Sequence, residues 1–141
     1  MSVSFRILPD RGLVFVRYAG VLRLEDTMNA FAEYARHPDC RPGQKQLVDL
    51  SAVTDVEQDF VQLMQVQAQK SEVFGDEGAE TLMVYVAPHH LGKQLARNIL
   101  RSWEPFDSVV ALVQEDEAHA LELLGQPERQ LDELWSIAKE A

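Results

Sequence analysis

Residues 45–60, KQLVDLSAVTDVEQDF, decide how the rest of the chain is interpreted. They begin with an apolar run around Leu47, Val48 and Leu50 and end in a segment rich in carboxylates. Short apolar runs bounded by polar residues are typical of buried strands. In open α/β sheets, ligands and partners meet the loops beyond the carboxyl ends of such strands. This stretch therefore predicts a central strand over residues 46–53 and a working loop over residues 54–59.

The flanking sequence predicts four more strands. Residues 81–87 (TLMVYVA) are the most continuous apolar run, and a strand that is apolar on both faces is typical of a parallel sheet covered on both sides. Residues 108–113 (SVVALV) predict the last strand. Residues 4–8 and 13–18 flank Pro9-Asp10-Arg11-Gly12. Proline presets a turn and glycine accepts a positive φ, so these two runs predict an N-terminal β-hairpin.

Segments with helical periodicity follow the hairpin and separate the remaining strands. Helices are expected over residues 24–36, 56–73, 88–103, 115–124 and 127–139. On the second of these helices, the polar side chains are expected to face mostly water: Gln62, Gln65, Gln69 and Lys70.

This order predicts an α/β fold with a mixed, mainly parallel sheet of about five strands and right-handed crossovers. Residues 1–141 are read as a single domain, with residues 126–141 as a C-terminal helical extension. Crossovers of one hand gather helices on one side of the sheet, so the opposite face needs cover, either from this extension or from a second subunit. A homodimer is expected because closed two-fold dimers are the commonest soluble assembly.

The composition excludes several classes of partner. Thirteen Lys and Arg against 23 Asp and Glu give a net charge of −10, which disfavours nucleic acid and anionic membranes. No apolar run approaches the ~20 residues that span a membrane, and the N-terminus lacks a signal-peptide pattern, so a cytoplasmic location is expected. The single cysteine, Cys40, allows neither an internal disulfide nor a cysteine metal cluster.

One motif carries a family resemblance. Residues 47–54, LVDLSAVT, resemble the apolar-Asp-Leu-Ser-x-Val-Thr strand before the switch loop of anti-sigma-factor antagonists, and the element order over residues 4–124 is similar to that of STAS or SpoIIAA-like domains. The resemblance implies a SpoIIAA-like fold and a non-enzymatic, regulatory, protein-binding role in a bacterium. In that family a phosphorylatable serine begins the next helix, whereas Glu57-Gln58-Asp59-Phe60 contains no hydroxyl, so the phosphoserine switch is not carried over. Asp59 could imitate a phosphoserine, although a carboxylate at a helix start is ordinarily dipole complementarity.

Basic residues gather after the most apolar strand. His89 and His90 begin the expected helix, and Lys93 follows His89 by four residues. With Arg97 and Arg101, Lys93 forms a row that could hold an anionic ligand or an acidic partner. The row lies opposite an apolar stripe, which favours a solvated face that pairs with the excess acidic residues.

Acidic residues gather around the working loop. Asp55, Glu57 and Asp59, with Asp49 on the strand, could perform acid–base chemistry or bind a divalent metal. Helix starts also favour negative charge, and no histidine is spaced as a metal motif. The sequence therefore assigns no catalytic residue, no metal ligand and no cofactor.

Two functional hypotheses remain open. In the leading one, a STAS-like domain binds an unknown protein or a copy of itself through a surface formed by Thr54, Asp55, Glu57, Gln58, Asp59, His89, His90 and Lys93. In the alternative, a pocket between helices carries an anionic or amphipathic small molecule, oriented by His89, His90 and Lys93. An enzyme is not expected, because no set of nucleophile, base and orienting residue emerges. A ligand-sized apolar cavity reached by His89 or His90 would favour the carrier, and a flat apolar patch around Trp135 or the hairpin, with no cavity, would favour docking.

Overall fold

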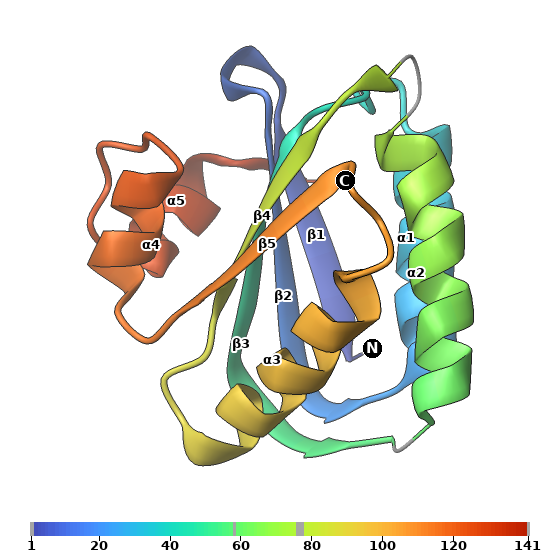
Figure 1. The fold of residues 1–141 in the computed structure, drawn as a ribbon. Helices are drawn as coiled ribbons and strands as arrows, with labels where there is room; N and C mark the ends of the chain where they lie inside the picture. Colours follow the sequence, from blue (N-terminus) through green and yellow to red (C-terminus); the bar gives the residue numbers. More distant parts are fainter. Residues whose placement is uncertain (1, 58, 76–77, 141) are drawn as a thin grey trace.

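A mixed sheet lies between two layers of helices in the computed structural model, which describes residues 2–57, 59–75 and 78–140 (Figure 1). The strands are β1 (Val3–Leu8), β2 (Leu13–Leu22), β3 (Lys45–Val56), β4 (Thr81–Val86), β5 (Val109–Gln114) and the two-residue β6 (Lys139–Glu140). The helices are the 3₁₀ turn η1 (Pro9–Arg11), α1 (Leu24–Arg36), α2 (Phe60–Phe74), α3 (His90–Trp103), α4 (Glu117–Leu123) and α5 (Leu131–Ile137).

The strand order of the sheet is β5-β4-β3-β2-β1-β6. Strands β2, β3, β4 and β5 are parallel neighbours, whereas β1 pairs antiparallel with β2 through the hairpin. The predicted α/β fold, with a mainly parallel sheet of five principal strands and an N-terminal hairpin, is confirmed. The sequence did not predict β6, which pairs antiparallel with β1.

The helices divide between the two faces as the strand order requires. From β2 to β5 the chain steps in one direction across the sheet, and crossovers of one hand then put their helices on the same face. Helices α1, α2 and α3 lie on that face, and α4 and α5 lie on the other (Figure 1). The C-terminal helices therefore cover the second face, which was one of the two expected ways of covering it.

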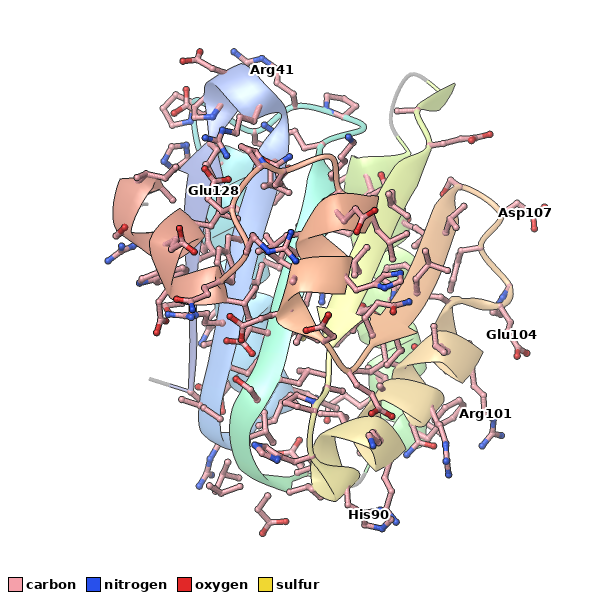
Figure 2. The ribbon with its side chains drawn as sticks, turned by 90° about the vertical axis from the view of Figure 1, so that its left-hand side faces the viewer. Arg41, His90, Arg101, Glu104, Asp107 and Glu128 are labelled. Carbon is pink, nitrogen blue, oxygen red and sulfur yellow. The ribbon has the colours of Figure 1, made fainter. Side chains whose placement is uncertain are left out.

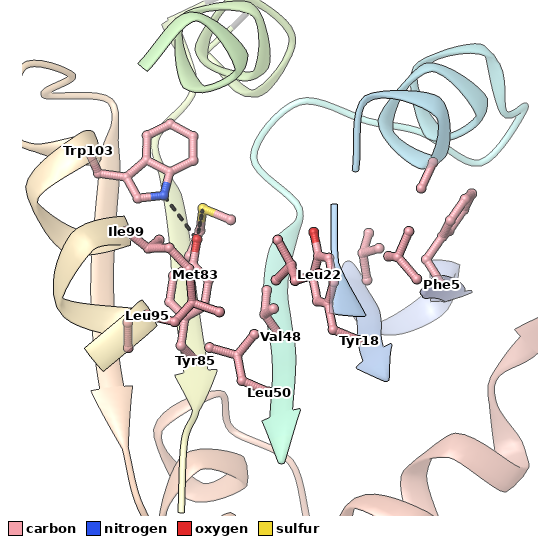
Figure 3. Packing of buried hydrophobic residues seen from close by; sticks show 14 of the residues in the cluster. Phe5, Tyr18, Leu22, Val48, Leu50, Met83, Tyr85, Leu95, Ile99 and Trp103 are labelled. Atoms are coloured by element: carbon pink, nitrogen blue, oxygen red, sulfur yellow. Dashed lines mark hydrogen bonds between the residues drawn. The ribbon is translucent and has the colours of Figure 1, made fainter. Parts of the chain in front are cut away.

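Alternation along each strand builds two cores, because successive side chains point to opposite faces. Val48 and Leu50 of β3 belong to the core under α1 and α3 (Figure 3), whereas Leu47 belongs to the core under α4 and α5. The second core is dense: Leu121 and Leu134 are 0% exposed.

Several predicted helices have different bounds. Strand β3 continues to Val56, so the helix expected over residues 56–73 begins at Phe60, where the Asp59 carboxylate accepts a hydrogen bond from the Gln62 backbone N–H (2.9 Å). The helix expected over residues 127–139 is only Leu131–Ile137, because Ala138 is extended and the next residues pair with β1. The helix expected from Pro88 likewise begins at His90, after an extended His89.

Candidate functional site

A cavity of about 250 Å³ lies between the sheet and helices α1, α2 and α3. Strands β1 to β4 supply its floor, with apolar residues such as Val14, Val16, Val48 and Met83. Leu24 and Phe31 of α1 and Leu95 and Ile99 of α3 line the helical side. The cavity thus has a mainly apolar lining, as small-molecule sites usually do.

The sequence of α2 explains why this space stays open. Helix α2 packs chiefly on its neighbours α1 and α3. Its cavity-lining residues recur at the spacing of one helical face and are Phe60, Leu63, Gln67, Lys70 and Phe74. Two of these five are polar, so this face of α2 cannot be buried against an apolar sheet as tightly as an all-apolar stripe would be.

Lys70 is the one cation among the described lining residues. Although the residue keeps some exposure, its amine is surrounded by protein, and the loss of hydration lowers the pKa from 10.5 to about 8. Across the described residues it has neither a hydrogen bond nor an ion pair. The expectation that Lys70 faces mostly water is therefore wrong.

Gln67 lies one helical turn before Lys70 and is 2% exposed. Its Nε2 donates to Ser102 Oγ (3.0 Å), whose hydroxyl donates in turn to the Ile99 carbonyl (2.5 Å). Because the Ser102 proton is already used, the amide must turn its N–H₂ towards Ser102 and its oxygen away. That buried oxygen, Oε1, has no hydrogen-bond partner within the described part of the chain. Gln67 and Lys70 therefore make one part of the lining polar and incompletely satisfied.

Tyrosine hydroxyls on the lining are already engaged within the protein. Tyr85 accepts a hydrogen bond from Trp103 Nε1 (2.9 Å; Figure 3), and Tyr18 shares one with Thr27 (3.2 Å). Burial raises the pKa of both phenols above their ordinary value. They stay neutral at physiological pH and do not add charge to the cavity.

The segment after β3 forms a rim where the lining meets solvent. Glu57 and Asp59 are exposed and line the cavity, as does Asn98 of α3. Phe60 is 40% exposed, and the Arg101 guanidinium lies over its ring at 5.2 Å. Glu57 and Asp59 of the expected working loop therefore lie at the mouth of the cavity.

Other residues of the expected surface lie elsewhere. Thr54 and Asp55 are exposed residues within β3 and do not line the cavity, and Gln58 lies outside the described residues. His89 and His90 are exposed at the start of α3, where Figure 2 shows His90 pointing away from the fold.

The basic row is on the outer side of α3. Lys93 forms an ion pair with Glu115 (2.8 Å), and neither residue lines the cavity. Arg97 is exposed, and Arg101 points outward in Figure 2. The structure therefore does not bring His89, His90 or Lys93 to the cavity as the carrier hypothesis expected.

Asp49 lies apart from the rim carboxylates, on the face of the sheet that α5 covers. It is 4% exposed and forms an ion pair with Arg17 (3.2 Å), which also binds Asp132 of α5 (2.7 Å). This arrangement ties α5 to the sheet. Among the described residues, no group of three or more His, Cys, Asp or Glu could hold a metal ion.

Sequence reasoning missed Lys70 and Gln67 as site residues. The buried face expected for the helix over residues 56–73 consists of Val56, Phe60, Leu63 and Met64, which lie near its start. A buried stripe that continues at helical spacing from Leu63 to Phe74 passes through both Gln67 and Lys70.

Comparison of the chain with models of known protein families and with curated proteins finds no match. The STAS-like resemblance therefore remains an expectation from the sequence. Over the described residues, every helix is too short or too polar to cross a membrane.

Proposed function

We propose that the protein is a non-enzymatic, cytoplasmic domain that binds a small, mainly apolar molecule in the cavity beneath α2. The observation that carries the proposal is the cavity itself, with about 250 Å³ and a mainly apolar lining. A dry apolar cavity of about 150 Å³ admits benzene, so by proportion this one suits a molecule of roughly ten non-hydrogen atoms.

The energetic cost of such a cavity supports a role in binding. Protein interiors are close-packed. The apolar side chains around this half-open space lack contacts that a closed core would give them. A ligand that fills the space supplies those contacts and stabilises the fold.

The test is to fill the cavity by mutation. Leu63 lines the cavity from α2, whereas Val61 on the same helix is 70% exposed and does not line it. We expect one-site binding of the neutral probe 1-octanol by calorimetry, weakened at least tenfold by Leu63→Trp and unchanged by Val61→Trp. A wild-type protein that does not bind 1-octanol or its shorter and longer homologues would overturn the proposal.

We propose self-association as a second candidate, in keeping with the STAS-like docking role. Strand β5 forms an edge of the sheet, and its Val110 and Leu112 are 49% and 36% exposed. Edge strands present unpaired backbone groups that can pair with another chain, and an antiparallel β5 pair would close a two-fold dimer. Light scattering should then give a dimer that Val110→Lys converts to a monomer. A monomeric wild-type protein at all concentrations would exclude this assembly.

A further inference from the structure

The polar part of the cavity indicates which apolar molecules fit. Lys70 and Gln67 are three residues apart on α2 and line the same space. An ammonium group has three donors, and that of Lys70 has no acceptor among the described residues. Most of the remaining lining is apolar. A matching ligand is therefore apolar over most of its length and carries an acceptor at one end.

We infer that the ligand is an amphipathic monocarboxylic acid whose carboxylate pairs with Lys70 and whose apolar part lies against the sheet. This inference rests on the proposed function, because it assumes that the cavity holds a ligand. It names the chemical class of that ligand and the residue that selects it.

The single positive charge of Lys70 favours a monocarboxylate over other polar end groups. One buried cation is balanced by one negative charge, and a phosphate dianion would leave the second charge uncompensated away from water. An amine ligand would bring two positive groups together. An alcohol would satisfy a donor of Lys70 but leave its charge unpaired.

The protonation state of Lys70 decides whether its amine forms an ion pair with the ligand or attacks it as a nucleophile. With a pKa of about 8, the amine is mostly protonated at pH 7. A protonated amine pairs with carboxylates and does not attack carbonyl groups. The exposed carboxylates of Glu57 and Asp59 line the rim, where solvent and salt screen their repulsion of an incoming anion.

Octanoate and 1-octanol test the inference, because they differ chiefly in the charged end. We expect calorimetry at pH 7 to give octanoate an affinity at least tenfold higher than that of 1-octanol. Lys70→Met should abolish this difference by weakening octanoate at least tenfold, while 1-octanol stays within about threefold of wild type. Lys93→Met, which removes an exposed lysine outside the cavity, should leave both affinities unchanged.

The two proposals fail differently. If 1-octanol binds and octanoate binds no more tightly, or if the preference for octanoate survives in Lys70→Met, the inferred ligand class is wrong and the cavity remains a binding site. If neither compound binds, the proposed function itself fails. Retention of 1-octanol binding by Lys70→Met shows that this variant keeps its cavity.

Discussion

Replacing Lys70 by methionine should stabilise the protein at neutral pH. Methionine keeps a long, flexible side chain but removes the charge that is buried without a partner among the described residues. A pKa lowered from 10.5 to about 8 corresponds to about 3 kcal/mol, at ~1.4 kcal/mol for each pH unit. Because part of the residue stays exposed, we expect the free energy of unfolding to rise by about 1–3 kcal/mol in Lys70→Met.

The gain should depend on pH in a defined direction. Between about pH 8 and 10.5 the unfolded chain keeps the Lys70 proton that the folded chain has lost. The unfolded state then binds more protons, so this lysine makes wild-type stability rise with pH through that window. The variant lacks this contribution. Its advantage is full below about pH 8 and vanishes above about pH 10.5.

Urea unfolding at pH 7, 9 and 10.5 measures this difference, with Lys93→Met as the matched control. Lys93 forms an exposed ion pair with Glu115, so its loss should change stability by only about 0.5 kcal/mol. A Lys70→Met variant that is less stable than wild type at pH 7, or whose difference from wild type is independent of pH, would refute the reasoning. If Lys70→Met is more stable than wild type at pH 7, the wild-type protein keeps a residue that lowers its stability, as functional sites often do.

Three further substitutions test the packing around the site, each by urea unfolding at pH 7. Tyr85→Phe should lower stability by about 1–3 kcal/mol, because it leaves the buried Trp103 N–H without its acceptor; an unchanged value would contradict that hydrogen bond. Gly92→Ala should raise stability by about 0.5–1 kcal/mol, since the added methyl group meets its neighbours at 3.5 Å or more in a helix; a loss would indicate a clash. Arg17→Met should cost about 3 kcal/mol or more by leaving the Asp49 carboxylate buried and unpaired; a small effect would mean that water or another cation reaches Asp49.

Apolar runs and turn residues were sufficient to predict the five principal strands of the sheet. Residues 46–53, 81–87 and 108–113 are apolar runs that favour strands, and alternation with helices leaves few topologies for them. The helix expected over residues 24–36 has the observed bounds because its start and its end at His37-Pro38 are both encoded locally. Helix α5 ends earlier than expected because Ala138 leaves the helix before the β6 pairing with β1, a contact between distant parts of the chain.

The cavity was beyond prediction for a different reason. It depends on how far α2 stands from the sheet, which is set by packing on α1 and α3 rather than by the period of α2 alone. Lys70 and Gln67 are hydrophilic, and hydrophilic residues on a helix ordinarily face water. The sequence favours a helix start over a helix middle for ligand binding, and it therefore points to His89, His90 and Lys93. None of these three residues lines the cavity.

Methyl NMR of the labelled protein during an octanoate titration shows where a ligand binds, because the sheet separates two sets of methyl groups. We predict shifts in the methyl signals of Leu63, Met83 and Ile99, which line the cavity, and none at Leu121 and Leu134, which pack on the opposite face. Shifts confined to the opposite face, or no saturable shift at either face, would contradict ligand binding in the cavity beneath α2.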